Sequence, residues 1–152
     1  MTDDVFDDLY CRLYIQFDGT LNILRKNITS YFGGSISIGS VFDEYVSINV
    51  MKNDGFLPDK IHEHAGFVYY PYTAEVEPTL AIMTPYAAMA KRKWKTIDTE
   101  IYWDVLCYVI RKLRENGAIV VASCEYENLI AEKTGWNWSE DTPNAPNLTL
   151  PS

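Results

Sequence analysis

Histidine occurs only twice in this chain, and both residues stand in the segment His62-Glu63-His64. If this segment were a strand, alternate side chains would point the same way and the two imidazoles could share a metal ion. A third histidine does not exist, and the carboxylates of Asp54, Asp59 and Glu63 have no recognised ligand spacing. The polar surroundings favour a solvated loop whose histidines titrate near neutral pH. The sequence therefore predicts no metal site and no cofactor.

Cys124 is the second candidate for chemistry. It precedes Glu125 at an expected change from strand to helix, and a helix N-terminus can lower a thiol pKa. A catalytic thiol also needs a base, which His62 or His64 could supply. The apolar run Val120–Cys124 instead favours a core position, and the acidic neighbour opposes thiolate formation. We therefore interpret this cysteine as structural.

Pairs of acidic residues are the third candidate, because two carboxylates can divide the roles of acid and base. Glu75 with Glu77 and Glu125 with Glu127 are such pairs, but a chain with 21 acidic residues produces them by chance. The sequence also has no dinucleotide-binding glycine motif, no phosphate-binding loop and no nucleophile-elbow motif. It predicts a protein that is not an enzyme, with a small thiol- or metal-dependent enzyme as the less favoured alternative.

The charge of the chain gives a stronger signal, since a net charge of −8 accompanies a 47% hydrophobic composition over 152 residues. This combination predicts one well-packed domain with an acidic surface, which repels nucleic acid and anionic membranes and attracts a basic partner. The acidity is uneven. Residues 1–79 contain 12 acidic and 5 basic residues, whereas residues 80–100 contain 4 basic and 2 acidic residues.

The cysteine count and the first residues bear on location. Three widely spaced cysteines among apolar residues favour reduced thiols over a disulfide framework. The acidic first residues have neither the positive nor the apolar region of a secretory signal, and no apolar run has a membrane-spanning length. We therefore expect a cytoplasmic protein without a membrane partner. Its oligomeric state cannot be read from the sequence.

Hydrophobic periodicity predicts an alternation of strands and helices. The first half should contain a strand at 9–17, a helix at 20–32, two strands near 36–38 and 45–50 forming a hairpin, a polar loop at 54–66 and a strand at 67–77. Pro71 in that last strand should lie at an edge or a bulge, because proline cannot donate to the ladder. The second half should contain a helix at 98–116, a strand at 118–124 and a short helix at 125–134.

The expected packing follows from these elements. Helix 98–116 places Ile101, Val105, Val109 and Leu113 at i+4 spacing, which predicts its buried stripe. The apolar run 118–124 predicts a strand buried on both faces near the middle of the sheet. The fold class is α+β: a mostly antiparallel sheet with two main helices packed on one face. Residues 1–135 should form this single domain, and residues 136–152 an irregular tail.

Two segments together resemble a known family. They are Gly66–Pro78, with the sequence GFVYYPYTAEVEP, and the helix-Gly117-strand unit that ends in VVASCEYE at Glu127. This pair resembles bacterial immunity proteins of contact-dependent growth inhibition systems, a class of polymorphic toxin systems. The resemblance covers about the last half of the domain and transfers no catalytic residue.

The resemblance implies a function in protein binding. Such a protein binds one cognate toxin domain, often a basic nuclease, and blocks its active site; an acidic face suits this task because charge complementarity speeds encounter. The acidic residues in expected loops are the predicted contacts: Asp43, Glu44, Asp54, Asp59 and Glu63. The alternative is that these residues only keep the domain soluble. A second alternative for the whole chain is an acidic nucleic-acid mimic, or an adaptor, that inhibits another protein.

Overall fold

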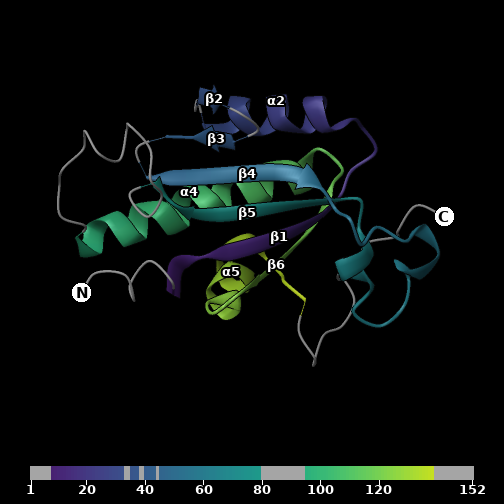
Figure 1. Cartoon of the computed structure of the whole chain (residues 1–152). Coiled ribbons are helices and arrows are strands. Elements are labelled where there is room, and N and C mark those ends of the chain that lie inside the picture. Colours follow the sequence, from purple (N-terminus) through teal and green to yellow (C-terminus); the bar gives the residue numbers. More distant parts are fainter. Residues whose placement is uncertain (1–7, 33–34, 38–39, 44, 80–94, 139–152) are drawn as a thin grey trace.

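The computed structural model describes residues 8–32, 35–37, 40–43, 45–79 and 95–138 (Figure 1). One sheet contains strands β1 (Cys11–Gln16), β2 (Ser35–Ser37), β3 (Ser40–Phe42), β4 (Val46–Lys52), β5 (Tyr72–Pro78) and β6 (Ile119–Cys124). The order is β2-β3-β4-β5-β1-β6, and every neighbouring pair is antiparallel. The helices are α2 (Leu21–Phe32), α4 (Thr96–Glu115) and α5 (Glu127–Thr134), with the 3₁₀ turns η1 (Pro58–Lys60) and η2 (Gly66–Tyr69). The predicted α+β class is confirmed.

The main core lies between the sheet and helices α2 and α4. Helix α2 lies against β3, β4 and α4, and α5 lies against α4 and β6. Figure 1 shows α4 behind the strands. Alternation in the strands supplies the inward-facing residues: Cys11, Leu13 and Ile15 of β1 are fully buried, whereas the residues between them are only half-buried. No helix in the described ranges is long and apolar enough to cross a bilayer.

Helix α4 has a buried stripe that is rotated from the predicted one. Ile101 and Val105 are only half-buried, whereas Tyr102 is fully buried beside Leu106 in the core. The Tyr102 hydroxyl donates a hydrogen bond to the carbonyl of Leu9 at 2.7 Å. Because that bond satisfies its only polar group, the tyrosine can occupy a position that hydrophobic periodicity alone gives to an aliphatic residue.

A second cluster covers the opposite face of the sheet at one end. The buried members are Ile61, Tyr70, Ile119 and Val121, and the partly buried ones are Tyr14, Phe67, Tyr69, Trp136 and Trp138. Strand β6 is therefore buried on both faces over most of its length, as its apolar run predicted. The segment between β4 and β5 supplies much of this cover.

The predicted central place of β6 is wrong, because β6 is an edge strand. On the outer side of β6, side chains make the hydrogen bonds to the backbone that a further strand would make. The Asn137 amide accepts from the Ala122 N–H and donates to the Ala122 carbonyl, both at 2.9 Å, and Arg114 donates to the Val120 carbonyl at 2.7 Å. Residues 136–138 thus belong to the fold, contrary to the predicted tail; the rest of that tail lies outside the described residues.

Two predictions for the first half also need correction. Strand β5 lies between β4 and β1, so Pro71 is not at a sheet edge; it precedes the strand, and its carbonyl accepts from the Asn53 N–H at 2.9 Å. Phe67–Tyr69, expected as strand, form η2. Three strands, rather than two, lie between α2 and the polar loop, because β2 and β3 have only three residues each and give little periodic signal.

Candidate partner-binding surface

The loop of residues 53–66, here called the acidic loop, connects β4 to η2 at the right-hand end of the sheet (Figure 1). It contains three of the five predicted contact residues: Asp54, Asp59 and Glu63. All three are exposed. Within the described part of the chain their carboxylates make no hydrogen bond and no ion pair. They are free to meet a positively charged partner.

Asn53 holds the start of the acidic loop. Its side-chain nitrogen donates to the carbonyls of Val68 at 2.9 Å and Tyr70 at 2.7 Å. Its side-chain oxygen accepts from the Gly55 N–H at 2.9 Å, which closes an Asx turn. One residue thus joins the two ends of the loop. The order Asn53-Asp54-Gly55 is typical of a turn and could have marked Asn53, but the carbonyls that it reaches lie 15 and 17 residues further along the chain.

Close packing holds the end of the loop. Gly66 is buried, and a Cβ at this position would lie 2.4 Å from the Ile61 carbonyl oxygen, so only glycine fits without a shift. Ile61 itself packs with Ile119 and Val121 of β6 in the second cluster. Because this packing and the Asn53 hydrogen bonds act at both ends, the loop presents its side chains from a fixed backbone.

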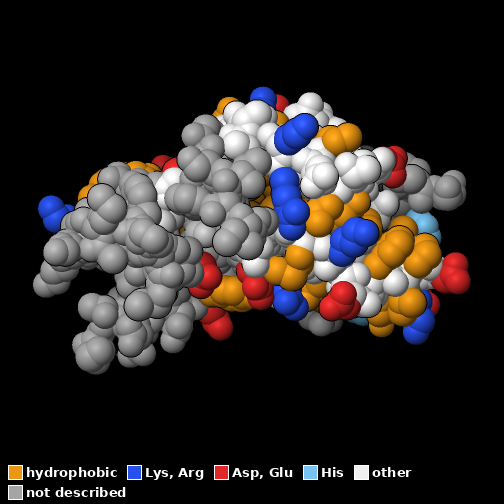
Figure 2. Space-filling view, turned by 45° about the horizontal axis from the view of Figure 1, so that its top comes forward, with side chains coloured by type: hydrophobic (Ala, Val, Ile, Leu, Met, Phe, Trp, Pro, Cys, Tyr) orange, Lys and Arg blue, Asp and Glu red, His pale blue; other side chains and the backbone are white. Residues whose placement is uncertain are grey.

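Two large hydrophobic side chains stand out from this fixed loop. Phe56 and Leu57 are 42% and 45% exposed, and they lie between Asp54 and Asp59 in the chain. Figure 2 shows hydrophobic side chains gathered beside the pale blue histidine at the right, with Lys and Arg side chains along the middle of this view. The surface is therefore mixed in charge here. The acidic loop presents exposed Phe56 and Leu57 between Asp54 and Asp59 in the chain, and it also carries exposed Lys60.

Asp43, a further predicted contact, lies at the opposite end of β4. Asp43 precedes β4 and the acidic loop follows it, so the strand of seven residues, roughly 20 Å long, separates them. The Asp43 carboxylate accepts from the N–H groups of Tyr45 and Val46, each at 2.7 Å, and so forms part of its own turn. Glu44 lies outside the described residues. The structure does not gather the predicted set into one surface.

The histidines lie within the acidic loop, in turns rather than in a strand. The alternation that would have aimed both imidazoles at one ion is therefore missing. The His64 ring meets the edge of Trp138, with 5.8 Å between ring centroids. The described residues contain no group of three or more His, Cys, Asp or Glu side chains placed to hold a metal ion.

Cys124 lies at the far end of β6 from the strand positions that contact the acidic loop. Its opposite residue across the ladder is Cys11, and its N–H donates to the Glu127 carboxylate at 3.1 Å. The acidic loop that contains His62 and His64 packs through Ile61 on Ile119 and Val121, at the other end of β6. Neither histidine is therefore a neighbour of Cys124. The thiol–imidazole pair considered from the sequence does not form.

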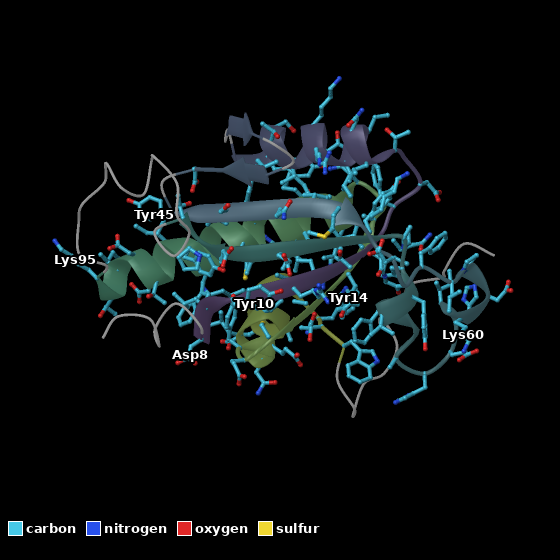
Figure 3. The ribbon with its side chains drawn as sticks, in the orientation of Figure 1. Asp8, Tyr10, Tyr14, Tyr45, Lys60 and Lys95 are labelled. Carbon is cyan, nitrogen blue, oxygen red and sulfur yellow. The ribbon has the colours of Figure 1, made fainter. Side chains whose placement is uncertain are left out.

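Glu75 and Glu77 meet on the sheet face away from the helices. The hydroxyl of Tyr10, whose position is labelled in Figure 3, donates to Glu75 at 3.0 Å. Arg12 contacts the same Glu75 oxygen at 3.5 Å. Burial and the Glu75 carboxylate raise the pKa of Tyr10 to about 12, while burial and then the charge of Glu75 raise the pKa of Glu77. Two partners thus hold the carboxylate of Glu75, which gives Glu75 a structural role on this face.

Comparisons with protein-family models, curated proteins and solved structures each give no match. The geometry itself defines an α+β domain that presents a rigid, exposed acidic loop beside a covered sheet edge.

Proposed function

We propose that this chain is an immunity protein that binds a cognate, basic toxin domain and blocks its active site. The observation that carries the proposal is the acidic loop, which presents exposed Phe56 and Leu57 from a backbone held at both ends. The carboxylates of Asp54, Asp59 and Glu63 in the same loop pair with no residue that the structure describes. The net charge of −8 and the resemblance of residues 66–78 and 120–127 to immunity proteins support the same function.

The loop has the three properties that a tight protein contact needs. Aromatic and aliphatic anchors supply most of the binding free energy when a partner buries them. Asp54, Asp59 and Glu63 attract a basic surface and raise the rate of encounter. The backbone is already ordered by Asn53 and Gly66, so binding loses little conformational entropy.

The test is to co-express the chain with the product of the adjacent reading frame, purify both, and measure association and dissociation rates at several salt concentrations. We expect nanomolar binding to a basic domain, with an association rate that falls as salt rises. If the neighbouring product does not bind, the immunity function is wrong.

Two sets of variants locate the contact. Phe56→Ala with Leu57→Ala should weaken binding about 100-fold, mainly through faster dissociation. Asp54→Asn, Asp59→Asn and Glu63→Gln together should lower the low-salt association rate about tenfold and flatten its salt dependence. The charge variants should leave the melting temperature unchanged, because their three side chains are exposed. Phe56 and Leu57 are only 42% and 45% exposed, so binding of that pair is measured well below its own melting temperature.

Matched controls come from exposed residues elsewhere on the domain. Ile23→Ala, at a residue of α2 that is 49% exposed, controls for the loss of apolar surface. Glu100→Gln, Glu125→Gln and Glu132→Gln together control for the loss of three charges. If both controls weaken binding as much as the loop variants, the acidic loop is not the contact surface even though the partner is correct.

A further inference from the structure

Cys11 and Cys124 stand directly opposite each other in the β1–β6 ladder, on the face that packs against the helices. Both are free thiols. Cys11 is fully buried, whereas Cys124, at the last position of β6, is partly exposed. Two residues 113 positions apart in sequence are thus brought together by strand pairing.

The hydrogen bonds of β6 show which kind of pair they form. Ala122 gives both its N–H and its carbonyl to Asn137, on the outer side of the strand, so its pairing with Leu13 is of the non-hydrogen-bonded kind. Pair types alternate along an antiparallel ladder, so Cys11 and Cys124, two positions further on, form the same kind. Such pairs have Cα atoms about 4.5 Å apart, which falls at the short end of the range that a disulfide can span.

The surroundings divide the two thiols into a reactive and a protected one. A hydrogen bond with Cys11, joined by one from the Tyr126 backbone, lowers the pKa of Cys124 against the opposing effects of burial and the charges of Glu127 and Glu125. Burial raises the pKa of Cys11 well above its ordinary value. A reagent from solvent can therefore reach the sulfur of partly exposed Cys124, which is also the thiol that ionises more readily. The sulfur of Cys11 is buried and protonated beside it.

We propose that Cys11 and Cys124 form a peroxide-sensitive dithiol that closes into a cross-strand disulfide between β1 and β6. The Cys124 thiolate attacks hydrogen peroxide, forming a sulfenic acid as the O–O bond breaks and hydroxide leaves. The Cys11 thiol then attacks the sulfenic sulfur, so that the S–S bond forms and the S–O bond breaks with loss of water. Overall, two thiols and one peroxide give one disulfide and two waters.

The geometry favours a reversible bond. One sulfur of the pair is partly exposed, so a thiol reductant can reach the bond, and exposed disulfides are more easily reduced than buried ones. Cys107, the third cysteine, lies on α4 with 1% exposure, and burial raises its pKa to about 11. It should stay reduced under the same treatment and serves as the internal reference.

The experiment uses the full chain, fully reduced, treated with one equivalent of hydrogen peroxide at neutral pH. Intact mass, thiol alkylation after unfolding and peptide mapping then report the products. We expect loss of two hydrogen atoms, a linked pair of peptides containing Cys11 and Cys124, one alkylated thiol at Cys107, and full recovery of three thiols after reduction with dithiothreitol.

Serine variants assign the roles, with retention of fold checked by circular dichroism. Cys124→Ser should remove the reaction with peroxide. Cys11→Ser should leave Cys124 oxidised but unlinked, and Cys107→Ser should behave as the unmodified chain does. Recovery of three free thiols after peroxide, or oxidation of Cys107 in place of the linked pair, would overturn the proposal. The result does not depend on whether a toxin partner exists.

Discussion

The two ends of β4 both carry an acidic turn, but their carboxylates have different uses. At one end, the Asp43 carboxylate accepts two backbone N–H groups of its own turn, so its charge forms part of the fold. At the other end, the uncharged amide of Asn53 makes the hydrogen bonds that hold the turn, and Asp54, Asp59 and Glu63 pair with nothing in the described part of the chain. Acidic residues in loops are therefore not equivalent, and the backbone around each one decides whether it is available to a partner.

The largest effect should come from Gly66→Ala. A Cβ would lie 2.4 Å from the Ile61 oxygen and 2.6 Å from the Lys60 oxygen, and backbone atoms cannot move aside cheaply. We expect a loss of about 3 kcal/mol in the free energy of unfolding, measured by urea denaturation. Binding through the acidic loop should weaken as well. An unchanged free energy would mean that the loop is not held at its end by this close approach.

Asn53→Ala should have the next largest effect. It removes two hydrogen bonds to carbonyls and one from the Gly55 N–H, and we expect a loss of about 2 kcal/mol in the free energy of unfolding. Amide exchange should speed up in the acidic loop and stay unchanged at the Asp43 turn. Asn53→Asp keeps the oxygen acceptor for the Gly55 N–H but replaces the donor with a charged oxygen facing two carbonyls, so it should be destabilised at least as much. Uniform acceleration at both ends of β4 would contradict the comparison.

Asp43→Ala should have the smallest of the three effects. The released N–H of Tyr45 belongs to a half-buried residue and can turn to water, whereas that of Val46 belongs to a fully buried one. The expected loss is about 1.5 kcal/mol, measured in the same denaturation assay. Asp43→Asn should restore most of the stability, because the side-chain oxygen that accepts the two hydrogen bonds remains. Partner binding should not change with either substitution. A binding defect without a stability defect would instead make Asp43 a contact residue.

Much of the fold could be predicted from the sequence where periodic signals are long. Helices α2 and α4 and strands β1 and β6 fall within two residues of the expected bounds. Local signals failed where a distant group decides the structure. Aromatic and β-branched residues at 67–69 favour a strand by composition. They form a 3₁₀ turn instead, where Gly66 approaches Ile61 closely and Asn53 donates to the Val68 carbonyl.

The candidate site was predictable only in part, for the same physical reason. Composition indicates that acidic residues lie in loops, but it cannot tell a carboxylate that accepts nearby N–H groups from one that stays free. The pairing of Cys11 with Cys124 depends on the register of β1 and β6, which the sequence of either strand does not contain.

The hydrogen bonds of the Asn137 amide also set a limit on how far the chain can be shortened from its C-terminal side. A chain shortened to residue 135, where the sequence suggested that the domain ends, would lose both hydrogen bonds to Ala122 and the cover from Trp136 and Trp138. Its β6 edge would then offer unpaired backbone groups to the same edge of another molecule, which is the route to aggregation by strand addition. Tags and fused domains therefore belong after residue 138.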